Sequence, residues 1–84
     1  MAALKARIDM NRLPSKETVA QLRVRYPKGC RVELVQMNDP YTNLMPGDKG
    51  TVEYVDDTGT VFCRWDRGST LGVVYGEDTI KSMT

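Results

Sequence analysis

Apolar residues recur at three- and four-residue spacing in the first third of the chain, which is the period of an α-helix. Val19, Leu22 and Tyr26 fall on one face of such a helix, and Ser15 precedes it as a residue that can cap the first turn. A proline directly after Tyr26 disfavours continuation. The pattern therefore predicts a helix over residues 15–26. Three apolar residues cannot stabilise so short a helix alone in water, so we expect it to pack on the rest of the protein.

After this segment the apolar positions alternate with polar ones, which is typical of β-strands with one buried face. Turn-forming sequences rich in Gly and Asp separate the alternating segments. The expected strands are Cys30–Leu34, Gly50–Val55, Val61–Trp65, Leu71–Tyr75 and Thr79–Ser82. Short strands joined by tight turns favour a sheet that curls into a barrel, since closure removes exposed edges. We therefore predict a mainly β protein: a small five-stranded barrel with one N-terminal α-helix packed on it.

The third expected strand decides where two aromatic residues lie. Trp65 continues the alternation of Val61 and Cys63, which favours a place in the core over a ligand-binding role. Phe62 and Arg64 have the opposite parity. They either face outward together or lie beneath the N-terminal helix, which needs an apolar surface. Of these two alternatives we favour the second.

One connection, over residues 38–47, is long and unusually apolar. A passive connector would be polar, but this one contains Tyr41, Leu44 and Met45, with Asp39 close to the tyrosine. Two interpretations are open. In the first, Leu44 or Met45 closes one end of the barrel and Tyr41 bonds to the backbone. In the second, the tyrosine ring stands on the surface as an aromatic contact for a partner. The candidate partner-binding residues are Asp39, Tyr41, Leu44 and Met45.

Charge is unevenly distributed, although the net charge of the 84 residues is only +1. Residues 1–31 contain eight basic and two acidic side chains, whereas residues 32–84 contain four basic and nine acidic ones. The simpler interpretation is a basic leader beside an acidic body. The alternative is a basic segment that contacts nucleic acid. The candidate contacts in that alternative are Lys5, Arg7, Arg12, Lys16, Arg23 and Arg25.

The sequence lacks the residue combinations that most catalytic sites need. It contains no histidine, which removes Ser-His-Asp and Cys-His catalysis and most transition-metal clusters. The acidic pair Asp56-Asp57 falls in an expected turn, where Asp stabilises the local backbone. We therefore expect no enzyme, no catalytic or metal-binding residue, no cofactor and no small-molecule substrate.

The two cysteines, Cys30 and Cys63, are too few for a disulfide framework and too far apart for a CxxC motif. Both lie in alternating segments, where a free cysteine behaves as a small hydrophobe. The chain shows neither a signal-peptide pattern nor a segment of membrane-spanning length. We expect a reduced, cytoplasmic protein that makes no membrane contact.

Several short motifs occur between Pro14 and the C-terminus. They are Pro14-Ser15-Lys16-Glu17, Tyr26-Pro27-x-Gly29-x-Arg31-Val32-Glu33-Leu34, Asp39-Pro40, Pro46-Gly47-x-x-Gly50-Thr51-Val52, Val55-Asp56-Asp57-x-Gly59, Trp65-Asp66-x-Gly68-Ser69 and Gly76-x-Asp78. Their combination resembles domain of unknown function 4314, a family of Gram-positive bacteria and their mobile elements. The run from Gly29 to Val52 also resembles SH3-like barrels of the KOW and translation-protein kind. The resemblance implies an SH3-like barrel and no particular activity.

Two classes of function remain. The first is a non-enzymatic protein-interaction module of a bacterial or mobile-element protein, which acts through the long loop. The second is a nucleic-acid-binding accessory protein that uses the basic N-terminal segment, although the acidic body disfavours phosphate binding. We expect two parts in the chain: a basic N-terminal arm over residues 1–14 and a single barrel domain over residues 15–84.

Overall fold

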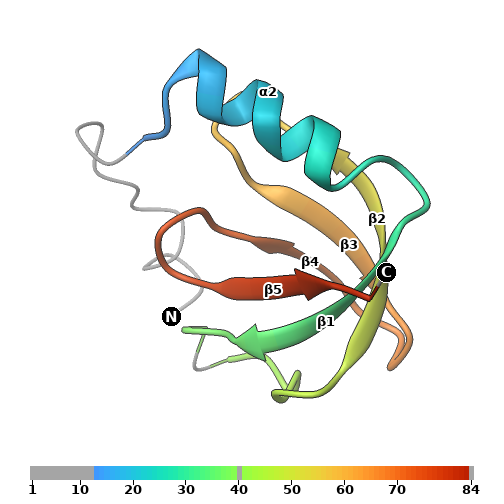
Figure 1. Ribbon diagram of the computed structural model, residues 1–84. Coiled ribbons are helices and arrows are strands. Elements are labelled where there is room, and N and C mark those ends of the chain that lie inside the picture. Colours follow the sequence, from blue (N-terminus) through green and yellow to red (C-terminus); the bar gives the residue numbers. More distant parts are fainter. Residues whose placement is uncertain (1–12, 40, 84) are drawn as a thin grey trace.

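One helix and five strands make up the part of the chain that the structure, a computed structural model, describes: residues 13–39 and 41–83. The strands form one antiparallel sheet in the order β4-β3-β2-β1-β5 (Figure 1). The elements are α2 (Lys16–Arg25), β1 (Arg31–Gln36), β2 (Lys49–Val55), β3 (Val61–Trp65), β4 (Thr70–Val73) and β5 (Thr79–Ser82). The predicted mainly β class is therefore confirmed, and each strand boundary lies within two residues of its expected place.

The helix begins and ends through the caps that the sequence provides. The Ser15 hydroxyl accepts a hydrogen bond from the Thr18 N–H at 3.1 Å, which satisfies one of the free donors of the first turn. At the other end, the Tyr26 N–H donates to the Leu22 carbonyl at 2.8 Å. The predicted range of 15–26 thus includes both caps, and the regular helix lies one residue inside it at each end.

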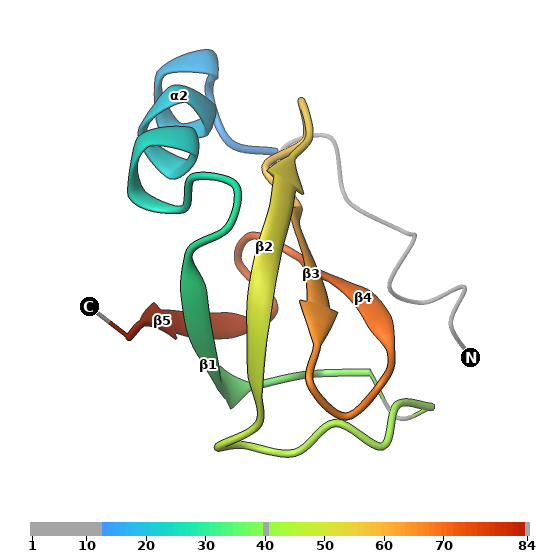
Figure 2. The same ribbon diagram turned by 90° about the vertical axis from the view of Figure 1, so that its right-hand side faces the viewer.

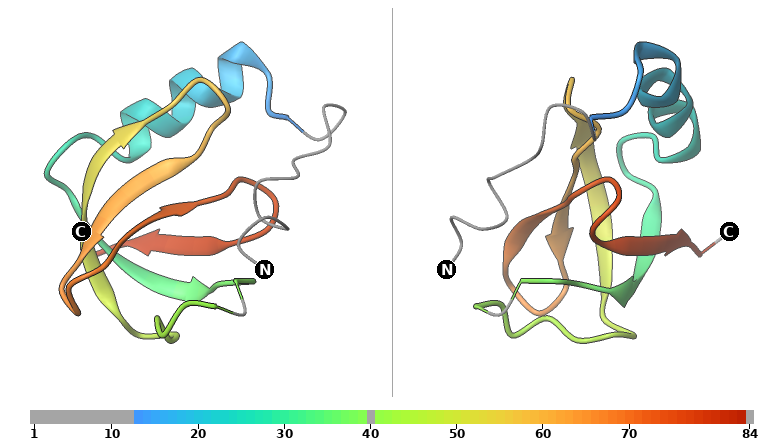
Figure 3. Two further views of the ribbon diagram at one scale, coloured as in Figure 1. Left: turned by 180° about the vertical axis from the view of Figure 1, so that it is seen from behind. Right: turned by 90° about the vertical axis from the view of Figure 1, so that its left-hand side faces the viewer.

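The sheet is strongly twisted, so that β5 runs nearly crosswise to β2 (Figure 2). α2 lies over the end of the sheet at which β2 turns into β3 (Figure 3). Bulges between Leu34 and Gln36 in β1 and between Val52 and Tyr54 in β2 add to the bend. Among the described residues no ladder joins β4 to β5, so the sheet is curled but not closed. The predicted barrel is correct only in this loose sense.

The core fills the concave side of the sheet. Its largest fully buried side chains are Trp65, Leu34, Val32, Val52 and Cys63. The indole Nε1 of Trp65 donates to the Leu71 carbonyl at 3.1 Å, so its polar atom is satisfied. Gly50 makes room for the ring, because a Cβ there would lie 2.8 Å from Trp65 Cε3. The predicted core role of Trp65 is confirmed.

The helix packs on this core through Val19 and Tyr26, which are buried, and Leu22, which is half-buried. Our preferred position for Phe62, beneath the helix, is wrong. The Phe62 ring instead stacks on Tyr54 on the opposite, outward face, with ring centroids 4.7 Å apart. The inward-facing residues of the sheet already supply the apolar surface that the helix needs.

The fourth strand ends earlier than its sequence pattern indicates. Val73 is its last residue, Val74 is buried, and Tyr75 is 44% exposed instead of continuing the inward alternation. The reason is that the Val74 N–H leaves the sheet and donates to Asp78 Oδ2 at 2.9 Å. The expected inward position of Tyr75 is therefore wrong.

The buried side chain of Asp78 connects the turn between β4 and β5 with the segment that follows β1. Asp78 is only 8% exposed. Its Oδ2 accepts the Val74 N–H, and its Oδ1 accepts the Asn38 N–H at 2.9 Å. Val74 follows β4 and Asn38 follows β1, so this side chain joins the β4–β5 turn to the start of the long loop. A buried backbone N–H that lost this acceptor would be left without a hydrogen-bond partner, at a cost in stability.

We expect Asp78→Asn to lower the free energy of unfolding by about 1–3 kcal/mol, because the amide replaces an accepting oxygen with a donor that faces a backbone N–H. Urea denaturation followed by far-UV circular dichroism measures this change. Asp57→Asn is the control, because the Asp57 side chain is 99% exposed. Equal and small shifts of the urea midpoint in both variants would contradict the assigned role of Asp78.

Candidate functional site

The long loop between β1 and β2 is attached to the sheet at both ends. At the β2 end, the Gly47 N–H donates to the Leu34 carbonyl and the Leu34 N–H donates to the Asp48 carbonyl, each at 2.8 Å. At the β1 end, Asn38 Nδ2 donates to the Glu77 carbonyl at 2.7 Å. These bonds reach from the loop to β1 and to the β4–β5 turn. They fix where the described parts of the loop, residues 37–39 and 41–48, leave and rejoin the sheet.

Polar side chains inside the loop bond its own backbone. Asp39 Oδ1 accepts the Tyr41 N–H at 2.9 Å, and Thr42 Oγ1 accepts the Leu44 N–H at 3.1 Å. Such turns by Asp and Thr stabilise a compact backbone without regular secondary structure. Asp39, a predicted partner-binding residue, thus orients the backbone at Tyr41.

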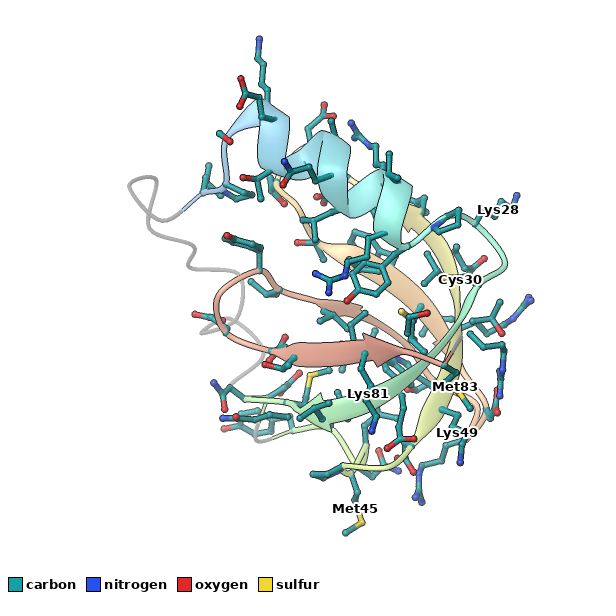
Figure 4. The ribbon with its side chains drawn as sticks, in the orientation of Figure 1. Lys28, Cys30, Met45, Lys49, Lys81 and Met83 are labelled. Carbon is teal, nitrogen blue, oxygen red and sulfur yellow. The ribbon has the colours of Figure 1, made fainter. Side chains whose placement is uncertain are left out.

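The loop divides its apolar side chains between core and solvent. Leu44 is 7% exposed and packs in the core, which corrects its inclusion among the candidate partner-binding residues. It is buried because so small a protein needs every available apolar side chain to close its core. Tyr41 and Met45 are 66% and 60% exposed. Figure 4 shows Met45 pointing away from the sheet. We call Tyr41 and Met45 the loop surface.

An ion pair supports the backbone at Met45. Asp48 Oδ2 accepts the Met45 N–H at 2.9 Å and Arg67 Nε at 3.0 Å, while Asp48 Oδ1 accepts Arg67 Nη2 at 3.0 Å. Arg67 lies in the β3–β4 turn, so this turn is tied to the loop. The hydrogen bonds from Arg67 and then from the Met45 N–H hold the pKa of Asp48 below its ordinary value.

The basic residues of the helix are less available than the sequence indicates. Arg23 Nη2 lies 2.9 Å from Asp57 Oδ1, which neutralises part of its charge. The Arg25 guanidinium lies 5.9 Å from the centroid of the Tyr26 ring, in a cation–π contact. Lys16 is exposed at the start of the helix. The remaining nucleic-acid candidates, which lie outside the described residues, are Lys5, Arg7 and Arg12.

The outward face of β2 and β3 carries a stacked aromatic pair that our sequence-based site prediction missed. The rings of Tyr54 and Phe62 are 20° from parallel, and Tyr54 is 56% exposed. Arg64 follows two residues after Phe62 and is also exposed. We call Tyr54, Phe62 and Arg64 the outer aromatic face. The parity of Phe62 and Arg64 is visible in the sequence. The bulge after Val52, which turns Tyr54 outward to meet Phe62, is not.

Comparison with protein families gives a match over almost the whole described fold. The family model described as Domain of unknown function (DUF4314) matches residues 15–83, from the helix cap to the residue after β5. The chain belongs to this family. No curated protein matches the sequence. Because the match includes the loop surface and the outer aromatic face, both lie within the DUF4314 domain.

Asp56 of this DUF4314 domain, which the sequence places in a turn, is hydrogen-bonded to the backbone of that turn. Asp56 Oδ1 accepts the Thr58 N–H at 2.9 Å and the Thr60 N–H at 3.0 Å, which shapes the β2–β3 turn. Gly59 completes this turn with a φ of 81°. Within the described ranges, no group of three or more His, Cys, Asp or Glu side chains is arranged to hold a metal ion. No described helix has the length and hydropathy needed to cross a membrane.

Neither cysteine of the domain is activated as a nucleophile. Cys63 is buried, and burial raises the pKa of its thiol to about 12. Cys30 is half-buried, and burial raises its pKa as well. Since the thiolate is the reactive form, both side chains act as small apolar groups.

We expect the Asp48 ion pair to make the order of the loop depend on pH. The folded pKa of Asp48 is depressed, so its contribution is present above the ordinary Asp pKa of about 3.9 and is lost as the pH falls through the lower folded value. Asp48→Asn mimics the protonated side chain and should speed hydrogen exchange of the Met45 amide at neutral pH. At strongly acidic pH the wild-type and variant rates, each corrected for intrinsic exchange, should converge. A variant rate equal to wild type at neutral pH would refute this role.

The reactivity of the Cys63 thiol tests whether this side chain is buried in the folded protein. We expect iodoacetamide at mildly alkaline pH to leave Cys63 unmodified in the folded protein, because its pKa of about 12 keeps the thiolate scarce. In denaturant both cysteines should react. Peptide mass spectrometry after a timed reaction distinguishes the two sites, and rapid native alkylation of Cys63 would contradict its buried position.

Proposed function

We propose that this DUF4314 protein is a small, non-enzymatic binding module that recognises a protein partner through its loop surface. The proposal rests on one observation: Tyr41 and Met45 are exposed on a loop whose backbone is bonded to the sheet. Tyrosine and methionine are enriched in the buried centres of protein interfaces. A loop that is ordered before binding loses less conformational entropy when the complex forms.

The surroundings of the loop surface support this assignment. Val35 in β1 is 44% exposed, and its neighbour Leu34 pairs with Gly47 of the loop, so further apolar surface lies beside the loop. The Asp48–Arg67 ion pair adds a polar border. An apolar centre with a polar rim is the usual arrangement of a protein-binding surface.

Other functions have less support from the described residues. The Asp56 and Asp78 carboxylates are engaged by backbone N–H groups, which leaves no pair of acids poised for acid–base chemistry. Nucleic-acid binding through the helix is disfavoured because Arg23 is paired with Asp57. Two free thiols fit a reducing compartment, so we place the module in the cytoplasm, in a bacterial or mobile-element setting that the family resemblance suggests.

A photo-crosslinking residue at position 41 tests the proposal in the native host. We expect it to form a defined adduct with one protein, whereas the same residue at position 75 should not. The purified partner is then titrated by calorimetry. Tyr41→Ala should weaken its binding by more than tenfold, as expected for a central aromatic contact.

Stability measurements separate a contact role from a structural one. Tyr41→Ala should leave the thermal midpoint nearly unchanged, because the side chain is 66% exposed. Leu44→Ala should lower the free energy of unfolding by about 2–5 kcal/mol, a typical cost for a buried leucine. Tyr75→Ala is the control for loss of an exposed tyrosine. Intact partner binding by Tyr41→Ala would overturn the proposal.

A further inference from the structure

The two rings of the outer aromatic face are held in a defined orientation against the sheet. Phe62 pairs with Gly72 of β4, and a Cβ at Gly72 would lie 2.5 Å from Thr60 Cγ2 and 3.1 Å from Phe62 Cε1. The Thr60 methyl group and the Phe62 ring therefore occupy the space that a side chain at Gly72 would need. Tyr54 stacks on this ring with centroids 4.7 Å apart. The sheet thus supports Phe62, and Phe62 supports Tyr54.

Tyr54 remains accessible although it is stacked. Its side chain is 56% exposed, and the regular pairing of β1 with β2 ends at Thr51. No strand of the described sheet therefore pairs with Tyr54 on the side away from Phe62, although α2 contacts β2 next to it, where Arg23 Nε donates to the Val55 carbonyl at 3.2 Å. A further flat ring can extend the stack, because aromatic rings prefer offset parallel or edge-to-face contacts.

Positive charge lies on the same face. Arg64 is exposed and forms no ion pair among the described residues, and it stands between Thr51 and Thr70 in the strand register. Lys49, labelled in Figure 4, has the same parity as Thr51 and is likewise exposed, but it lies opposite Glu33 in the strand register and its charge also acts on Asp66. Glu53, at the bulge, is a nearby carboxylate without an ion pair among the described residues, and its charge acts on the Cys63 thiol.

The remaining charges of this face cancel in pairs. Arg31 donates to both carboxylate oxygens of Asp66, and Lys81 lies 3.6 Å from Glu33. The charged side chains named on this face are four cations (Arg31, Lys49, Arg64 and Lys81) against three anions (Glu33, Glu53 and Asp66), a formal excess of one positive charge. The stacked rings and the cationic side chains of this face together favour a ligand that is both flat and anionic.

We propose that the outer aromatic face binds single-stranded nucleic acid, with a base stacked on Tyr54 and a neighbouring phosphate on Arg64. Bases of any sequence present a flat π-face, and stacking on exposed aromatic side chains is a general mode of single-strand recognition. Arg64 lies two residues along β3 from Phe62, about 7 Å, within reach of an extended nucleotide backbone. This site is separate from the basic N-terminal segment.

The site is also separate from the loop surface. The loop joins β2 at Lys49, whereas Tyr54 lies five residues further along, roughly 17 Å for an extended strand. Figure 2 shows the loop and the β2–β3 turn at opposite ends of β2. A variant on one surface therefore leaves the other intact, and the two proposals are tested independently.

Fluorescence anisotropy with a labelled oligothymidine of about 12 nucleotides tests the proposal, since this length spans the site of one small domain. We expect Tyr54→Ala to weaken binding roughly 5- to 150-fold, the equivalent of one lost stacking contact. Tyr54→Phe keeps the ring and should bind as the wild type does. Tyr75→Ala and Tyr41→Ala should also bind normally, because both remove a tyrosine elsewhere.

Two further measurements separate stacking from charge. An abasic oligonucleotide of equal length keeps the phosphates without the bases, and it should bind wild type and Tyr54→Ala equally weakly. Arg64→Gln should reduce the slope of log affinity against log salt by about 0.7, the value for one phosphate contact on a single strand. Circular dichroism confirms that each variant is folded.

Three results would overturn the proposal. The first is no binding of oligothymidine by the wild type at low salt. The second is equal affinity of Tyr54→Ala and Tyr75→Ala for oligothymidine. The third is a protein partner whose binding requires Tyr54 while oligothymidine does not compete with it, since the face would then serve a peptide and not a nucleic acid.

Discussion

Trp65 occupies the concave side of the sheet, where Gly50 on the neighbouring strand leaves space for its ring. A sheet of five short strands can enclose so large a side chain only if it bends around it. Bulges in β1 and β2 contribute that bend, α2 covers one end, and Leu44 from the long loop joins the core. In a chain of 84 residues the inward positions are thereby committed to packing. The exposed side chains that remain available for contacts with other molecules lie on the outward face of the sheet and in the long loop.

The elements that depend on local chemistry were predictable from the sequence. Ser15 caps the helix, and the alternation around Val61 and Trp65 gives a strand with one buried face. These features depend only on residues that are close in the sequence, so the sequence pattern is sufficient to predict them. The family resemblance over the barrel segment agrees with the match over residues 15–83.

The predictions that the sequence left open or got wrong depend on contacts between distant segments. Leu44 packs in the core because the end of the sheet leaves space for it. The residues next to Leu44 in the sequence do not reveal this space. Phe62 was assigned to the helix because the helix needs an apolar surface, but inward residues of several strands already provide one. The outward position of Tyr54 could not be predicted for a different reason. One extra residue in β2 places Tyr54 on the opposite face of the sheet from Val52.

The two surfaces for which we propose binding roles, the loop surface and the outer aromatic face, lie at opposite ends of β2 (Figure 2). The loop surface depends on hydrogen bonds to the β4–β5 turn, whereas the outer aromatic face depends on pairing among β2, β3 and β4. Each therefore has its own structural support. The two proposals therefore do not require their ligands to compete for one surface.

The position of β5 has a consequence for the order in which the chain assembles. β1 to β4 follow one another as sequence neighbours, but β5 pairs with β1 across more than forty intervening residues. Contacts between near neighbours form faster than those that close a long segment, so the topology favours late docking of β5. Asn38 is bonded to Glu77 and Asp78 at the entrance to this strand. These bonds require the β4–β5 turn to lie beside the loop, so we expect the Asn38 end of the loop to become fixed together with β5.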